Sequence, residues 1–179
     1  MDEDMMRKQV AINEKDGPAV IGKTNYSNSY LQEQFEENSD GKVYDFNKIN
    51  ALTQTHNGSR EGFKLNTPQS YRDTDFQDLG DDKEKYRWNI LPKSHIARDD
   101  FAGVIAMSKA FSTSMDNLDA ATQATMDIDS WLMTFALHSL IGNGDVYTVA
   151  SDHNLRLYTR PDNQKVMAMP WDMDHLWGG

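Results

Sequence analysis

Polar residues in the last third of the sequence have the types and spacing of a metal site. Asp145 ends a Gly-Asn-Gly-Asp stretch, Asn154 precedes an alternating run, and Asp172 follows a second apolar run. Asp174 lies two positions after Asp172. Carboxylate and amide oxygens suit Mg²⁺ or Mn²⁺, especially where phosphate supplies the remaining ligands. The predicted chemistry is therefore the binding of a hard divalent cation beside a phosphate group.

A β-hairpin is predicted to bring these residues together. Residues 155–159 alternate apolar and polar side chains, residues 166–169 form a second short apolar run, and Pro161-Asp162-Asn163 between them favours a turn. With the turn centred near Asn163, Asn154 lies nine positions before it and Asp172 nine after it. Antiparallel pairing then places these two residues side by side at the open end, and Asp145 reaches the same end from the preceding loop.

Three helices are predicted upstream of the hairpin. The first follows an N-cap at Asp99 or Asp100, and the second covers about residues 117–124. The third starts at Asp127 or Asp129 and ends at Gly142. Its predicted apolar face consists of Ile128, Trp131, Leu132, Phe135, Ala136 and Leu140. We expect this face to pack under the hairpin and to hold the turn that contains Asp145.

The N-terminal half gives weaker signals. Residues 16–18 predict a turn before a short strand at 19–21, followed by a helix at 30–37 and a strand at 42–46. Residues 47–98 are loop-rich, with Tyr71, Phe76 and Leu79 as candidate anchors. One partial domain is predicted over residues 1–179, divided into a segment at 1–46, the connection at 47–98, and the helices and hairpin at 99–179.

Composition narrows the functional classes. The 179 residues suffice for one domain, and the formal net charge of −10 argues against general nucleic-acid binding, which needs clustered Lys and Arg. The absence of cysteine excludes disulfides, thiolate metal sites and cysteine nucleophiles. No apolar run approaches the roughly 20 residues of a membrane span, and the acidic N-terminus is not a signal peptide.

Residues from about Trp131 to Trp177 resemble the CotH family, the spore-coat-type protein kinases. The similarity lies in the Gly142–Asp145 turn, the Asn154 before a Tyr-containing strand, and the sequence Pro-Trp-Asp-Met-Asp at 170–174. The resemblance implies an α+β, protein-kinase-like fold, mainly its larger C-terminal lobe. In that family the smaller, phosphate-covering lobe precedes the similar part, so the chain is expected to be a fragment that is inactive alone.

The resemblance also implies roles for the site residues. Asp145 is the expected catalytic residue for an attacking hydroxyl, and Asn154 and Asp172 are expected to bind Mg²⁺ or Mn²⁺ and, through it, ATP. Asp174 is a second metal ligand or a support for the loop. Kinase-like loops often separate the catalytic Asp and the Asn by about five residues. The separation here is nine, which leaves Asp152 as an alternative to Asp145.

The implied reaction transfers the γ-phosphoryl group of ATP to a Ser or Thr of a protein substrate, in a bacterial spore-coat or extracytoplasmic setting. One alternative is a non-catalytic, kinase-like surface or adhesion module that binds a protein partner. Another is a transferase that uses Asp172 and Asp174 with a nucleotide-sugar. His138 is expected to be packed rather than liganded, and Arg156 and Arg160 are expected to be solvated.

Overall fold

The computed structural model describes residues 8–12, 15–20, 26, 28–35, 39–47, 76–87, 89–147 and 153–173. The predicted α+β class is confirmed. In chain order the elements are β1 Lys8–Ile12, β2 Lys15–Val20, α1 Asn28–Phe35, β3 Lys42–Phe46, α2 Lys83–Tyr86, β4 Ile90–Pro92, the 3₁₀ turn η4 Ile96–Arg98, α3 Ala102–Phe111, α4 Met115–Thr125, α5 Ile128–Leu140, β5 Leu155–Thr159 and β6 Val166–Pro170.

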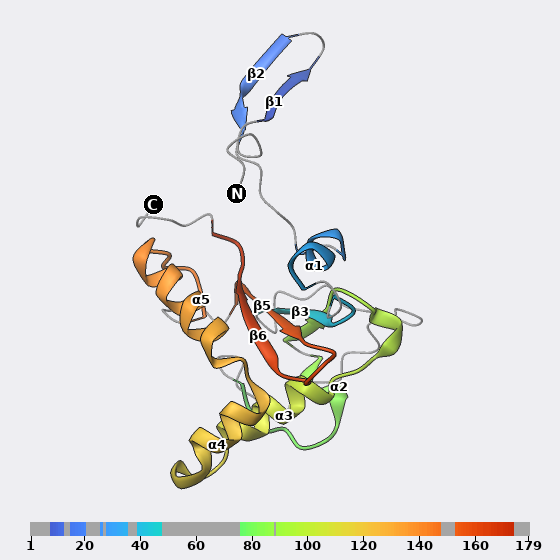
Figure 1. The fold of residues 1–179 in the computed structure, drawn as a ribbon, viewed down its shortest axis with the longest axis vertical. Coiled ribbons are helices and arrows are strands. Elements are labelled where there is room, and N and C mark those ends of the chain that lie inside the picture. The colour runs from blue at the N-terminus through green and yellow to red at the C-terminus, as the bar shows by residue number, and fades with distance from the viewer. Residues whose placement is uncertain are drawn as a thin grey trace.

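A four-stranded antiparallel sheet with the order β4-β3-β5-β6 forms the centre of the fold (Figure 1). The predicted β5–β6 hairpin is confirmed, and the predicted strand at 42–46 forms β3 within the same bounds. Because β3 pairs with β5, the hairpin is an inner and an edge strand of this sheet rather than an isolated ribbon. The larger sheet thereby fixes the position of the hairpin's open end.

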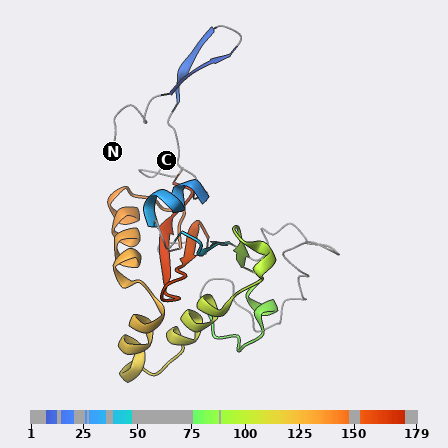
Figure 2. The ribbon, with the colours of Figure 1, turned by 45° about the vertical axis from the view of Figure 1, so that its right-hand side comes forward.

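Helices cover both faces of the sheet (Figure 2). Alternate residues of β3 and β5, among them Phe46 and Leu157, pack against Val104 of α3 and Trp131 of α5 in the main core. The other face carries a smaller cluster in which Leu31 of α1 packs with Val43, Tyr158 and Met169. All five residues of β5 are therefore buried, although their sequence alternates between apolar and polar residues.

Helix α5 contacts the hairpin, but it lies along the outer edge of β6 rather than under the hairpin as predicted. The main-chain oxygen of Val166 accepts hydrogen bonds from the Asp127 amide (3.0 Å) and from Nε1 of Trp131 (2.9 Å). The oxygen of Ala168 accepts from Oγ1 of Thr134 (3.0 Å), and its amide donates to Oγ of Ser130 (3.2 Å). These bonds satisfy main-chain groups that an edge strand otherwise leaves to solvent.

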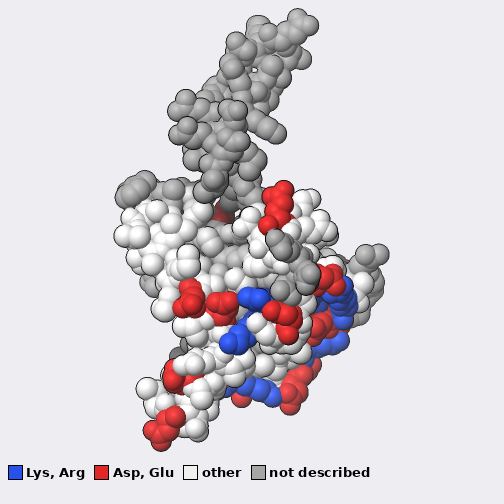
Figure 3. Space-filling view, in the orientation of Figure 1, with Lys and Arg blue, Asp and Glu red and all other residues white. Residues whose placement is uncertain are grey.

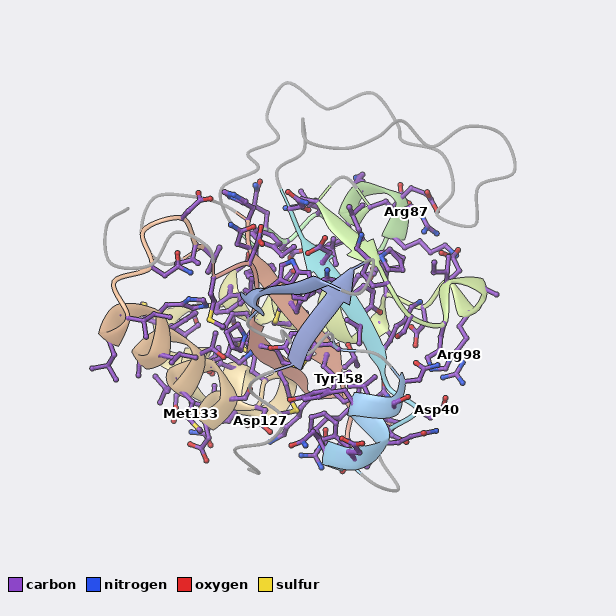
Figure 4. All side chains as sticks on the ribbon, turned by 90° about the horizontal axis from the view of Figure 1, so that it is seen from above. Asp40, Arg87, Arg98, Asp127, Met133 and Tyr158 are labelled. Carbon is purple, nitrogen blue, oxygen red and sulfur yellow. The ribbon has the colours of Figure 1, made fainter. Side chains whose placement is uncertain are left out.

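The predicted apolar face of α5 is confirmed only in part, because Trp131 is buried and Ile128 and Phe135 pack against the main core, whereas the other predicted residues do not. Trp131, Thr134 and His138 face the sheet and are buried, because Thr134 and Ser130 are needed as hydrogen-bonding groups there. Leu132 and Leu140, both predicted to be buried, are 60% and 77% exposed. Figure 3 shows few charged side chains over the outer side of α5, and Figure 4 shows Met133 pointing away from the sheet.

The predicted helix ends are mostly confirmed. Asp127 is the N-cap of α5, and its carboxylate accepts from the Ser130 amide at 3.2 Å. Gly142 follows the end of α5 with a φ of 62°, a conformation that glycine adopts without strain. The N-cap of α3 is Phe101 rather than Asp99 or Asp100 as predicted, although the amide of Ala102, the first residue of the helix, donates to Oδ1 of Asp100 (2.9 Å). The predicted second helix is α4, which is slightly longer than expected.

The structure differs more from the predictions in the N-terminal part of the chain. The turn predicted at 16–18 is wrong, because these residues lie inside β2, which pairs with the unpredicted β1. Helix α1 starts at Asn28, before the expected position. Phe76 is buried in the main core as expected, whereas Tyr71 lies outside the described residues. No helix in the described ranges is long and apolar enough to cross a membrane.

Candidate functional site

The open end of the β5–β6 hairpin carries Asn154 and Asp172, but the predicted register is off by one residue. Leu155 pairs with Pro170, so continuing the ladder places Asn154 opposite Trp171, with Asp172 one residue beyond. Both residues have left-handed backbones, with φ values of 59° for Asn154 and 53° for Asp172. Positive φ is uncommon for non-glycine residues and clusters at sites where the surrounding contacts hold the chain.

Asp145 lies beside Asn154, as the sequence predicts. Nδ2 of Asn154 donates to the main-chain oxygen of Asp145 at 2.7 Å and to its Oδ2 at 3.2 Å. Nε2 of His153 lies 3.3 Å from the same Oδ2. The carboxylate of Asp145 is one-third exposed, so it is accessible from solvent while two neighbours hold its orientation. Asp152, the alternative catalytic residue, lies outside the described residues.

The turn before Asp145 is anchored to helix α5. The Asp145 amide donates to Oδ1 of Asn143 at 3.2 Å, and the Asn143 amide donates to the main-chain oxygen of His138 at 3.0 Å. Nδ2 of Asn143 and Nδ1 of His138 are 3.3 Å apart. Burial lowers the pKa of His138. The neutral ring is therefore favoured, and its Nδ1 accepts from the side-chain Nδ2 of Asn143. The expectation that His138 is packed is confirmed.

Arg156 is a residue whose importance the sequence did not reveal. It was expected to be solvated, but it is only 9% exposed, with its guanidinium carbon 3.8 Å from the ring centroid of Trp171. Helix α1 and its cluster cover this face of the sheet, which explains the burial. Arg160, in contrast, lies at the turn end, where it pairs with Asp162 at 2.8 Å with 26% of its side chain exposed.

The donor atoms at this end fit a hard cation better than a soft one, because they are carboxylate and amide oxygens. The residues that could contribute such oxygens are Asn154 and Asp172; Asp174 lies outside the described residues. Among the described residues, no group of three or more His, Cys, Asp or Glu side chains gathers in a way that could hold a metal ion. Any metal at this end would therefore need oxygens from the amide of Asn154 or from a bound phosphate.

A protein-family model described as CotH kinase protein matches residues 24–179. The match includes the four-stranded sheet, its covering helices and the open end of the hairpin, whereas β1 and β2 precede it. Neither a curated protein nor a solved structure matches the chain.

Proposed function

Because this chain belongs to the CotH kinase protein family, we propose that it is the catalytic part of a protein kinase that transfers the γ-phosphoryl group of ATP to a Ser or Thr hydroxyl. The family supports a kinase-like protein. The observation that carries the more specific proposal is the contact between Asp145 and Asn154, nine residues apart in the sequence, at the open end of the hairpin. An Asp and an Asn from one loop, followed by an Asp after a hairpin, is the arrangement that kinase chemistry uses.

In this proposal Asp145 orients the substrate hydroxyl and accepts its proton as the oxygen bonds to the γ-phosphorus and the bond to ADP breaks. His153 and Asn154 hold the carboxylate in place through their contacts with Oδ2. Asn143 fixes the main chain of the same residue from the side of α5. The chain thus holds the proton acceptor from two directions.

Mg²⁺ or Mn²⁺ with ATP would be held by Oδ1 of Asn154 and by the carboxylates of Asp172 and Asp174. Since Asn154 donates to Asp145 through Nδ2, its amide oxygen is directed away from that carboxylate. When bound, the metal would neutralise phosphate charge. Within the same proposal, the sheet with α3, α4 and α5 corresponds to the larger lobe of a kinase-like fold, and the substrate is a protein in a spore-coat or extracytoplasmic setting.

The test is Mg²⁺-dependent ³²P transfer by the full-length protein to a Ser/Thr-containing protein substrate or to itself. We expect Asp172→Asn to abolish transfer and Asp145→Asn to lower the rate by about 100-fold or more, the usual contribution of a positioned base. Asp116→Asn, an exposed carboxylate at the start of α4, is the control and should leave transfer unchanged. Asp152→Asn tests the alternative base in the same assay.

Each outcome separates the candidate functions. Normal turnover by Asp172→Asn would refute the metal assignment, and loss of activity in Asp152→Asn but not in Asp145→Asn would move the catalytic role to Asp152. Binding of Mg·ATP by a folded wild-type protein without transfer to any substrate points to a pseudokinase. If the folded wild-type protein neither binds Mg·ATP nor transfers phosphate, the result favours the non-catalytic module that binds a protein partner.

A further inference from the structure

Arg156 is enclosed by charged and aromatic groups from three parts of the chain. It lies opposite Asp45 in the β3–β5 ladder, and its Nε is 3.3 Å from Oδ1 of that residue. The other oxygen of Asp45 lies 3.5 Å from Nζ of Lys93, which follows β4. The Asp45 and Arg156 side chains are each only 10% exposed. Removing one partner of a buried ion pair leaves an uncompensated charge, which costs more than the loss of an exposed pair.

The guanidinium also contacts the loop that contains Asp172. Its carbon lies 3.8 Å from the ring centroid of Trp171, the residue immediately before Asp172. A cation over an indole face at this distance is strongly attracted. The ring of Tyr26 lies 6.0 Å from the same tryptophan, and its hydroxyl donates to the Pro170 oxygen at 2.6 Å. The chain on the N-terminal side of Asp172 is therefore held by side chains from β5 and from the residues before α1.

Asp172 has a φ of 53°, a left-handed conformation that few non-glycine residues adopt, with Asp and Asn the most frequent among them. Conformations of this kind persist where the surrounding contacts determine them. Arg156 is thus joined to Asp172 through the backbone of the stacked tryptophan.

We propose that Arg156 is a positioning residue: held by Asp45, it fixes Trp171 and thereby the backbone of Asp172 in the orientation that binds the metal–nucleotide complex. This inference rests on the proposed function for the role of Asp172, but the contacts that carry it are independent of that function. A planar guanidinium is required, because lysine has the charge but cannot stack on the indole while keeping the ion pair with Asp45.

The decisive variant is Arg156→Lys in the full-length protein, well below its melting temperature. We expect the Kd for Mg·ATP, measured by calorimetry, to rise about tenfold, as for other residues that orient metal ligands. Hydrogen exchange of residues 170–173, measured by mass spectrometry without metal or nucleotide, should be faster than in the wild type. Asp45→Asn keeps the arginine and its stacking while weakening its anchor, so both effects should be smaller and in the same direction.

Arg160→Lys is the matched control. Arg160 follows the same strand but lies at the turn end of the hairpin, and its contacts are with Asp162 and Asp127. Neither the Kd nor the exchange of 170–173 should change in this variant. A merely structural role for Arg156 would lower the melting temperature without a selective effect on either readout at a temperature where the protein is folded.

The outcomes for the two proposals are distinguishable. Unchanged exchange of residues 170–173 in Arg156→Lys overturns the positioning role, whatever the nucleotide result. Faster exchange in a protein whose wild type binds no Mg·ATP overturns the proposed function but leaves the contact between Arg156 and Trp171 as the support of this loop. If Arg156→Lys does not fold, unchanged exchange in Asp45→Asn overturns the positioning role.

Discussion

At the scale of single residues, the site depends on polar side chains that are buried with specific partners. Asn143, His138 and Arg156 have little exposed surface. Asn143 bonds the main chain of Asp145, His138 contacts Asn143, and Arg156 contacts the tryptophan next to Asp172. A sequence shows that such residues are polar, but it does not show that they are buried. Among these three residues, the sequence indicates a role in the site only for Asn143, because it lies in the Gly-Asn-Gly-Asp turn that was predicted to be functional.

His138 gives a pH dependence with a defined sign. Burial lowers its pKa in the folded state, so the unfolded chain binds a proton more readily, and its contribution to stability is lost as the pH falls below the ordinary histidine pKa of about 6.5. We expect the urea midpoint to fall between pH 7.5 and 5.5 by a larger amount in the wild type than in His138→Gln, which does not titrate. An equal fall in both proteins would show that His138 does not contribute.

At the scale of elements, the boundaries were predictable and the orientations were less so. The hairpin, β3, the cap at Asp127 and the end at Gly142 depend on local patterns, and all of them were predicted. The face of α5 was predicted only in part, because Thr134 donates a hydrogen bond to, and Ser130 accepts one from, a strand more than thirty residues away. The predicted pairing of Asn154 with Asp172 was also wrong. Arg160 and Lys165 close the turn, so its centre lies half a residue before Asn163 and every pairing shifts by one residue.

Thr134→Val tests the link between α5 and β6. The change keeps the shape of the side chain but leaves the buried Ala168 oxygen without the Thr134 hydroxyl, which should lower the free energy of unfolding by about 1–3 kcal/mol. Thr125→Val is the matched control, since its hydroxyl bonds the Ala121 oxygen within α4, and it should cost less than about 0.5 kcal/mol. Equal effects in urea denaturation of the two variants would contradict the proposed importance of this bond.

At the scale of the whole molecule, the outer side of α5 leaves an apolar surface exposed. Met133 is 73% exposed, alongside Leu132 and Leu140. Beside it, a cavity of about 510 Å³ between α4 and α5 is lined mainly by Phe111, Met115, Leu118, Met126, Ile128, Trp131, Leu132, Phe135 and Tyr147. Exposed patches of this kind promote association, although the net charge of −10 opposes it.

We therefore expect the 179-residue chain to self-associate in a salt-dependent way, because salt screens the repulsion between like-charged copies. The triple variant Leu132→Ser, Met133→Ser and Leu140→Ser should stay monomeric at protein concentrations where the wild type associates. Its melting temperature should change little, since these side chains lie outside the core. Sedimentation velocity at low and high salt measures the association state of both proteins. Association that persists in the variant would show that another surface makes the contact.

The closed edge of β6 has a consequence for how a protein substrate is recognised. Val166 and Ala168 already use their outward main-chain groups with α5, Pro170 has no amide hydrogen, and its oxygen accepts from Tyr26. An extended peptide therefore finds no main-chain partners along β6 and cannot lengthen the sheet by adding a strand there. Under the proposed kinase function, a protein substrate is therefore held by contacts other than strand pairing along β6.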